Sequence, residues 1–269
     1  MQIDTFMTIG KNHKVCEDYI LSGMNPIPYI IISDGCSSSK GTDMGARLLC
    51  FLSQQYIRFR ASSTNHFEPD HDEMGLWIIH NAELVGKQLG LPKNALDATL
   101  IIGYQYTEDI IKVHFYGDGC VIHFRPNYGS IEIIEYSKNA PYYLSYKIDD
   151  ERHNLYHSMN QQRIIKTYLI EPEYVEICNP YDNNKSVFNF GLSEIDSGLL
   201  IASDGLASFI KDEEGVIPFP SFVKNFFAFK TTKGEFLKRR ANKELITLAK
   251  DGIYNYDDLS IGAFLLGSE

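Results

Sequence analysis

The chain has 269 residues, a length that fits one large domain or two small ones. Its hydrophobic content of 44% and charged content of 22% are ordinary for a globular protein with a sizeable core. The formal net charge of −10 argues against a nucleic-acid-binding protein, which needs a basic face. If an acidic protein binds an anionic substrate, bound cations are needed to offset the repulsion between the two negative charges.

No apolar run approaches the length of a membrane span, and the first residues, MQIDTFMTIG, lack the basic and apolar pattern of a signal peptide. We therefore expect a cytoplasmic protein with no membrane partner. The five cysteines are odd in number and contain no C-x-x-C pair, so a disulfide frame or a zinc-thiolate site is not expected. Most of them are expected to be small core residues.

The first third of the chain predicts strands followed by helices. Residues 3–9 and 18–22 are typical of strands, and residues 27–33 predict a strand buried on both faces. A helix is then indicated, with Thr42 as its N-cap, by the helical spacing of the apolar residues Met44, Leu48, Phe51, Leu52 and Ile57. A second helix is expected from about residue 73 to 89, ended by Gly90.

Four strands are expected next, joined by short polar links, at residues 97–106, 110–116, 120–125 and 131–136. This order predicts an antiparallel meander with turns at 107–109 and 117–119. Residues 137–196 are polar and rich in tyrosine, and they predict an irregular, flap-like segment with a strand at 164–169. The tyrosines Tyr142, Tyr143 and Tyr146 would line a substrate flap or, on the more ordinary interpretation, pack on the surface.

The last part of the chain predicts a strand at 199–203, a helix at 236–250 and a strand at 259–266. The whole order predicts an α+β fold in which helices cover antiparallel sheets. No repeat, low-complexity tract or linker marks a boundary, so residues 1–269 are expected to form a single domain.

Acidic residues stand at the ends of several predicted strands. Asp34-Gly35, Asp204-Gly205 and Asp118 follow apolar runs, Asp257-Asp258 precedes one, and Glu17-Asp18 lies near the N-terminus. Antiparallel neighbours place the end of one strand beside the start of the next, so these motifs are expected to gather at one rim of a sheet sandwich.

Crowded carboxylates repel one another unless protons or cations intervene. Mg²⁺ and Mn²⁺ prefer oxygen ligands such as carboxylates, backbone carbonyls and water. The glycine after Asp34 lets the backbone bend so that the Gly35 carbonyl can also reach a cation. A simpler interpretation of a single Asp-Gly is a hairpin turn, and Gly117-Asp118-Gly119 taken alone fits that interpretation well.

The ordered set CEDY, YIIISDG, DATLIIG, FYGDGCVIHFR, LLIASDGLASF and YDDLSIGAFLL resembles the metal-dependent Ser/Thr protein phosphatases of the PPM, or type 2C, family, in a divergent bacterial-type branch. The resemblance spans about residues 10–266. It implies a four-layer αββα sandwich, with two central antiparallel sheets flanked by helices and two Mn²⁺ or Mg²⁺ ions at one end.

The resemblance also implies a role for each acidic residue. Asp34 would bridge both ions, Gly35 would lend its carbonyl, and Asp204 and Asp257 would hold the other ion. Glu17 and Asp18 would act mainly through metal-bound water, Asp118 would belong to a third, weaker site, and Asp258 replaces the family's asparagine. A hydroxide bridging the two ions would then hydrolyse phosphoserine or phosphothreonine in proteins.

The chain departs from the family pattern at His13 and at Cys36 as well. His13 stands where the family has a phosphate-gripping arginine, with Lys14 beside it, so both become candidate phosphate-binding residues and His13 a candidate proton donor. A solvent-exposed loop histidine is the alternative. Cys36 replaces a histidine proposed as a general acid in many animal members, and a neutral thiol substitutes poorly for it.

Three functions remain open on the sequence: a phosphatase acting on proteins, a pseudophosphatase that binds a partner, and a hydrolase of a small phosphorylated molecule. The first implies a phosphorylated protein substrate, a cognate Ser/Thr kinase and a signalling role. The chain is expected to be a monomer, because no long amphipathic seam stands out.

Overall fold

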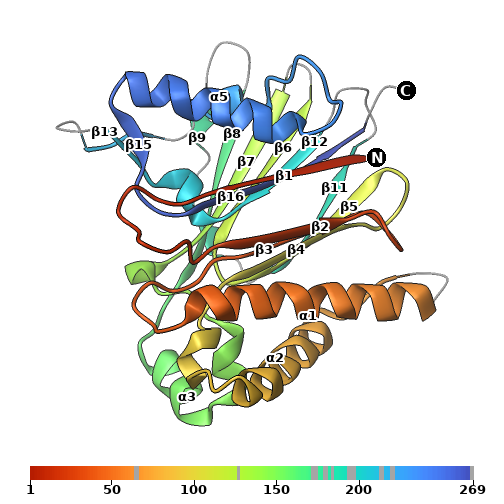
Figure 1. Cartoon of the computed structure of the whole chain (residues 1–269), viewed down its shortest axis with the longest axis vertical. Helices are drawn as coiled ribbons and strands as arrows, with labels where there is room; N and C mark the ends of the chain where they lie inside the picture. Colours follow the sequence, from red (N-terminus) through yellow and green to blue (C-terminus); the bar gives the residue numbers. More distant parts are fainter. Residues whose placement is uncertain are drawn as a thin grey trace.

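The computed structural model describes residues 1–63, 67–125, 128–170, 175–177, 181–182, 185–192, 198–211, 215–218 and 222–266. Cys178 lies outside these ranges. Within them the chain forms two large antiparallel sheets stacked face to face, with helices on both outer sides (Figure 1). This is the predicted α+β arrangement of antiparallel sheets covered by helices.

The larger sheet has the strand order β1-β16-β12-β6-β7-β8-β10, and β9 pairs with β8. Its strands are β1 (Gln2–Thr8), β6 (Gly119–Arg125), β7 (Tyr128–Tyr136), β8 (Arg163–Ile170), β9 (Val175–Ile177), β10 (Tyr181–Asp182), β12 (Gly198–Ala202) and β16 (Leu259–Leu265).

The second sheet has the order β11-β5-β4-β3-β2. Its strands are β2 (Tyr19–Gly23), β3 (Tyr29–Ser33), β4 (Leu100–Gln105), β5 (Ile110–Tyr116) and β11 (Val187–Gly191). A small third sheet joins β13 (Phe209–Lys211), β14 (Gly215–Val216) and β15 (Ile253–Asn255).

The helices form the two outer layers. The helices α1 (Thr42–Ser63) and α2 (His71–Gln88) pack below the smaller sheet, α5 (Phe236–Lys250) covers the larger one, and α3 (Asp150–Ser158) lies beside α2 (Figure 1). The remaining short helices are α4 (Lys224–Phe227), η1 (Lys93–Leu96), η2 (Ser137–Asn139), η3 (Leu144–Ile148) and η4 (Asp204–Ala207). None of the described helices is both long and apolar enough to cross a bilayer.

Alternation along the central strands explains the four layers. In β3, Ile30 and Ile32 face the core between the sheets, whereas Tyr29 and Ile31 face the core under α1 and α2. In β12, Leu199 and Ile201 likewise enter the central core, while its other side chains enter the core under α5. Because successive side chains of a strand point to opposite faces, a fully apolar strand must be covered on both sides.

The predicted four-strand meander is wrong. β4 pairs with β5 and β6 pairs with β7, but β5 and β6 belong to different sheets. The chain crosses the sandwich at Gly117-Asp118-Gly119, where the two glycines have φ of 106° and 135°. A Cβ at Gly119 would come within 2.9 Å of the Ala202 carbonyl, so this crossing requires glycine.

Two further predictions need correction. The first helix was expected to have Thr42 as its N-cap, but Thr42 is its first helical residue and its hydroxyl donates to Glu17. Of the apolar residues expected on its buried face, Leu52 and Ile57 are buried whereas Met44 and Phe51 are exposed. Ala46 and Leu49 are also buried. The segment predicted to be irregular contains α3 and β11 in addition to a strand where one was expected. Helix α3 buries only Tyr156, so its sequence carries almost no apolar periodicity.

Candidate functional site

Asp34 follows β3, a strand whose five residues are all buried. Thr99 fixes its backbone from the neighbouring strand region, because the Thr99 N–H donates to the Asp34 carbonyl at 2.8 Å and the Asp34 N–H donates to Thr99 Oγ1 at 3.3 Å. Gly35 then passes close to the chain around Glu17, and a Cβ at this position would lie 2.8 Å from the Cβ of Thr42. The glycine is therefore required by packing, whatever its carbonyl binds.

Asp204 occupies the corresponding place on the larger sheet. It follows β12, and the N–H of Ser203 donates to the Ser260 carbonyl at 3.0 Å, which holds the end of β12 against β16. Gly205 packs on the backbone of Asp258, where a Cβ would meet the Asp258 carbonyl oxygen at 1.7 Å. This close approach explains the second Asp-Gly and ties Asp204 to the Asp257-Asp258 pair.

Asp258 is a buried clamp on the N-terminal loop. Its Oδ1 accepts the backbone N–H of Gly10 at 2.8 Å, and its Oδ2 accepts that of Glu17 at 2.6 Å. Only 1% of Asp258 is exposed. Its role in the structure is thus to hold residues 10–17 beside the strand ends.

Glu17 and Asp18 lie against the site from the same loop. Glu17 Oε1 accepts a hydrogen bond of 2.8 Å from the Thr42 hydroxyl, so Thr42 uses its side chain here. Asp18 is buried, and its Oδ2 accepts a bond of 2.8 Å from the Ser203 hydroxyl. Its other oxygen, Oδ1, has no hydrogen-bond partner.

The four aspartates Asp34, Asp118, Asp204 and Asp257 line one cavity of about 260 Å³ at the end of the sandwich. They come from four segments far apart in sequence, as expected from the strand ends. The other lining residues are Gly35, Cys36, Ser37, Ser38, Thr99, Asn139, Pro141 and Tyr143. We call this space the carboxylate cavity.

His13 and Lys14 are not among the residues that line the carboxylate cavity. His13 Nε2 lies 3.4 Å from Asp257 Oδ1, and its Nδ1 lies 3.1 Å from Asp258 Oδ2. Burial lowers the pKa of His13, but the carboxylates of Asp258, Asp257 and Glu17 outweigh it, so the pKa is raised overall. The imidazole thus faces carboxylates in this structure.

The buried carboxylates disfavour one another's charge. Burial, then the charges of Asp18 and Asp204, raises the pKa of Asp34 well above its usual range. Burial followed by the charge of Asp204 does the same for Asp118, and raises the pKa of Asp257. Burial also raises the pKa of Asp18 to about 7. Such a cluster is stable at neutral pH only with protons or cations in it.

Divalent cations fit this donor set. The groups that converge are hard oxygen donors, and among them Asp18 Oδ1 and Asp204 Oδ1 are buried without a hydrogen-bond partner. Within the described part of the chain, no three His, Cys, Asp or Glu side chains already have the geometry of a metal site. The carboxylates therefore share one cavity, and binding a cation would draw their oxygens closer together.

Sequence reasoning missed several residues of this site. Thr99 and Ser203 hold the two aspartate turns, and neither stands out in the sequence. Tyr143 lines the cavity from the segment predicted to be irregular. The alternative of simple surface packing for Tyr143 is wrong, since it is 9% exposed.

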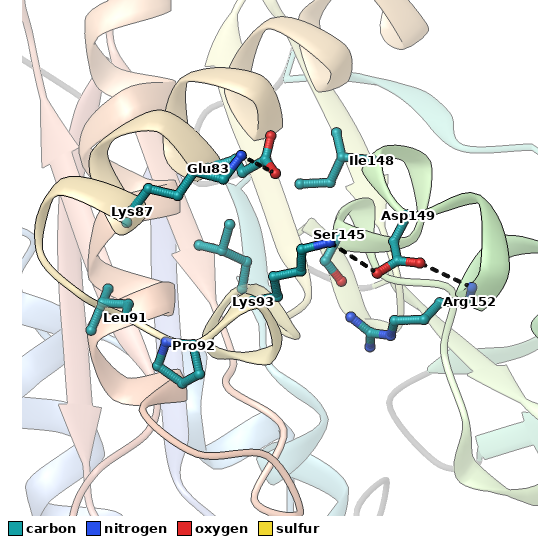
Figure 2. A pocket seen from close by; sticks show the side chains of 11 residues that line it. Glu83, Lys87, Leu91, Pro92, Lys93, Ser145, Ile148, Asp149 and Arg152 are labelled. Carbon is teal, nitrogen blue, oxygen red and sulfur yellow. Dashed lines mark hydrogen bonds and ion pairs between the residues drawn. The ribbon is translucent and has the colours of Figure 1, made fainter.

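A smaller hollow lies between α2, η1 and the start of α3 (Figure 2), and none of the four aspartates of the carboxylate cavity lines it. Its volume is about 30 Å³, which suits roughly one water molecule. The charged side chains around it pair with one another: Lys87 with Glu83 at 2.7 Å, and Lys93 with Asp149 at 3.7 Å. We assign no site to it.

The chain was compared with protein families, with curated proteins and with solved structures. A family model described as protein phosphatase 2C matches residues 10–248. No curated protein matches the sequence. Solved structures match in fold: a bacterial serine phosphatase at 14% identity, with TM-score 0.55 over 100% of this chain and 99% of that one, and the serine/threonine phosphatase Stp1 from Staphylococcus aureus at 14% identity, with TM-score 0.53 over 99% and 95%.

A third matching structure is the catalytic domain of the serine/threonine protein phosphatase PstP, described as a complex with two manganese ions. It is 10% identical, with TM-score 0.51 over 97% of this chain and 96% of that chain. At these identities the likeness shows a shared fold.

Proposed function

Because the chain belongs to the protein phosphatase 2C family, we propose that it hydrolyses phosphoserine and phosphothreonine in proteins with the help of divalent cations. The observation that carries the proposal is the convergence of Asp34, Asp118, Asp204 and Asp257 in one cavity. The family match over residues 10–248 also supports a single phosphatase domain.

In this proposal Asp34, Gly35, Asp204 and Asp257 hold two Mn²⁺ or Mg²⁺ ions, and Asp118 belongs to a third, weaker site. Glu17 and Asp18 support the ions through water. When bound, such cations supply an activated water and a clamp on the phosphate oxygens.

The chain's own residues would bind and orient the phosphate ester. The hydroxyls of Ser37 and Ser38 line the carboxylate cavity and are hydrogen-bond donors suited to phosphate oxygens. Burial raises the pKa of Tyr143, so its hydroxyl stays protonated and can donate at any working pH. Loss of the phosphate then leaves the substrate with a free serine or threonine hydroxyl.

The test compares a phosphothreonine peptide with para-nitrophenyl phosphate, each with Mn²⁺ and with chelator. Turnover that requires the cation, and that falls by orders of magnitude in Asp34→Asn and in Asp204→Asn while the melting temperature is kept, supports the proposal. Absence of turnover of both substrates under every metal condition would instead favour a partner-binding pseudophosphatase. Turnover of only the small ester would favour a hydrolase of small molecules.

A further inference from the structure

A second cavity, of about 390 Å³, lies beside the carboxylate cavity. Its walls come from the start of α2, the ends of β5 and β7, the start of β11 and the helix η3. This volume falls in the lower part of the range typical of ligand sites. We call it the tyrosine pocket, after the lining residues Tyr116, Tyr136 and Tyr142.

The tyrosine pocket lies at the same end of the sandwich as the carboxylates, because Gly117 lines the pocket and the next residue, Asp118, lines the carboxylate cavity. β5 ends at Tyr116, directly before the crossing that carries Asp118. Val187 at the start of β11 pairs with His114 near that end, and Tyr136 lies two residues beyond Ile134, the partner of Gly119. The register of three strands therefore places the pocket at this rim.

The two cavities share walls. Asp118 and Tyr143 line the carboxylate cavity, while their chain neighbours Gly117 and Tyr142 line the tyrosine pocket. Consecutive Cα atoms are only about 3.8 Å apart, so the two cavities lie next to each other at both places. A substrate chain in extended form advances about 3.3 Å per residue, so a residue a few positions from the phosphorylated one would reach the pocket.

The lining of the tyrosine pocket carries no net charge. Burial lowers the pKa of His71 to about 4, so the imidazole is neutral at pH 7. The ammonium group of Lys147 lies 2.5 Å from the carboxylate of Asp72, and these two charges offset each other. The remaining lining residues are not ionised at neutral pH.

Five of the eleven residues that line the tyrosine pocket have aromatic rings: His71, Phe115, Tyr116, Tyr136 and Tyr142. His71 stacks on Tyr116 with ring centroids 4.2 Å apart and planes inclined by 7°, which holds these two lining rings in a fixed arrangement. The Tyr142 hydroxyl lies 2.7 Å from His153 Nδ1, which fixes a second ring. Neutral aromatic walls of this kind suit an aromatic guest, which gains both burial and ring contact.

We propose that the tyrosine pocket is a subsite for an aromatic side chain located a few residues from the phosphoserine or phosphothreonine of the substrate protein. The proposal rests on the proposed phosphatase function and adds to it a sequence preference.

The experiment is a set of phosphothreonine peptides in which phenylalanine, leucine, glutamate, lysine or alanine occupies each flanking position in turn. The kcat/KM of each peptide is divided by the kcat/KM of para-nitrophenyl phosphate for the same protein sample. We expect phenylalanine at one or two positions to exceed alanine by roughly tenfold, the effect of a partly buried apolar group.

Two variants locate the preference. Val187→Phe fills the pocket from β11, and Tyr142→Ala removes one aromatic wall; either should reduce the phenylalanine preference to about twofold or less. The matched control is Ile246→Phe on the exposed face of α5, where Ile246 is 61% exposed, and it should keep the full preference. One variant adds side-chain volume to the pocket and the other removes it, so the test still gives an answer if one of them does not fold.

The outcomes separate the two proposals. If the peptides and the small ester are hydrolysed but phenylalanine gives no advantage, or if glutamate, lysine or leucine exceeds it, the subsite is wrong and the phosphatase function stands. A phenylalanine preference that survives in every folded pocket variant also overturns the subsite. Failure to hydrolyse any phosphorylated substrate overturns both.

Discussion

The carboxylate of Asp258 accepts the backbone N–H of Glu17 at 2.6 Å, across 241 positions of sequence. The same carboxylate accepts the N–H of Gly10 with its other oxygen. One buried side chain directly before β16 thus fixes both ends of the loop that carries His13 and ends at Glu17.

Asp258→Asn should therefore destabilise the protein. Asparagine has one side-chain oxygen, so one of the two backbone N–H groups would face an amide N–H₂ and lose its partner. A buried donor left unpaired costs about 1–3 kcal/mol, and we expect this loss in the free energy of unfolding measured with urea. Asp251→Asn, at the exposed end of α5, is the control and should change stability by less than about 0.5 kcal/mol. Equal stability of native and Asp258→Asn proteins would contradict the clamp.

The sequence allowed the strand ends of the site to be predicted because apolar runs at residues 29–32 and 199–202 come shortly before Asp34 and Asp204. A run of this kind must be buried on both faces, which limits where the following residue can lie. The crossing at Gly117-Asp118-Gly119 could not be predicted in the same way. The sequence Gly-Asp-Gly fits a hairpin as well as a passage between two sheets. The apolar and polar residues of β5 and β6 follow the same pattern whichever of the two connections joins the strands.

The positions of Tyr142, Tyr143 and Asp97 could not be predicted from the sequence, because they depend on contacts between distant segments. Tyr142 and Tyr143 are adjacent in the chain but line different cavities, and only the path of the backbone decides this. Asp97 looked like the first residue of a strand, yet it precedes β4 and accepts several side-chain bonds. Contacts between distant segments of this kind leave no periodic pattern in the sequence.

The carboxylate of Asp97 joins two walls of the carboxylate cavity. It accepts bonds from the hydroxyl of Ser39 at 3.0 Å, the hydroxyl of Ser145 at 2.7 Å and Arg152 Nη2 at 2.7 Å. Ser39 belongs to the loop after Asp34, whereas Ser145 and Arg152 belong to the segment that carries Tyr143. Asp97 is thus a positioning residue for both walls.

Arg152→Ala should loosen the wall that carries Tyr143, by removing a bond to Asp97, without changing the four aspartates that line the carboxylate cavity. We expect KM for a phosphothreonine peptide to rise several-fold, because the peptide needs both walls, while KM for para-nitrophenyl phosphate rises less. The control is Lys93→Ala, which removes an exposed ion pair of 3.7 Å to Asp149 and should leave both constants unchanged. Equal KM changes for the two substrates would argue against a positioning role.

His13 offers a test between two roles. The family resemblance predicts that it grips the phosphate, but its ring nitrogens lie 3.4 Å from an Asp257 oxygen and 3.1 Å from an Asp258 oxygen. If it positions these carboxylates, His13→Ala should raise the Mn²⁺ concentration for half-maximal activity by roughly tenfold, as loss of a partner behind a metal ligand does. KM at saturating Mn²⁺ should then change little.

A raised KM at saturating Mn²⁺, with an unchanged requirement for the cation, would instead support the phosphate-binding role of His13. Lys14→Ala, the neighbouring change, separates the loss of a positive charge from the loss of the imidazole. An increase in KM in both variants would point to a shared phosphate-binding loop.

The paired histidines beneath the tyrosine pocket predict a pH dependence of stability. His71 Nδ1 lies 3.1 Å from His114 Nδ1, and burial, as the largest cause, lowers the pKa of His71 to about 4 and that of His114 to about 3. At His71 the charge of Asp72 opposes the lowering of the pKa and that of Lys147 adds to it, whereas at His114 the charges of His71 and Lys112 both add to it. Both imidazoles are therefore neutral in the folded protein at pH 7.

The sign of the effect follows from proton linkage. The unfolded chain binds these protons near pH 6.5, whereas the folded chain resists them until about pH 4, so the contribution to stability is full above pH 6.5 and is lost as the pH falls toward 4. The raised pKa values of the buried carboxylates act in the opposite direction, so the histidine contribution is measured as a difference between native and variant proteins.

His114→Phe removes one titrating group and keeps an aromatic ring in its place. The variant is expected to be less stable at pH 7, because it loses the contacts to His71 and Tyr104, but its stability should fall less on acidification. Between pH 7 and pH 5 the free energy of unfolding of the native protein should fall by about 1–2 kcal/mol more than that of the variant, within the limit of about 1.4 kcal/mol per pH unit for one proton. Urea denaturation at pH 7 and at pH 5 measures the free energy of unfolding of each protein. His80→Phe, on the exposed face of α2, is the control and should show the same fall between the two pH values as the native protein. Parallel losses in the native and His114→Phe proteins would show that the buried pair does not take up protons on unfolding.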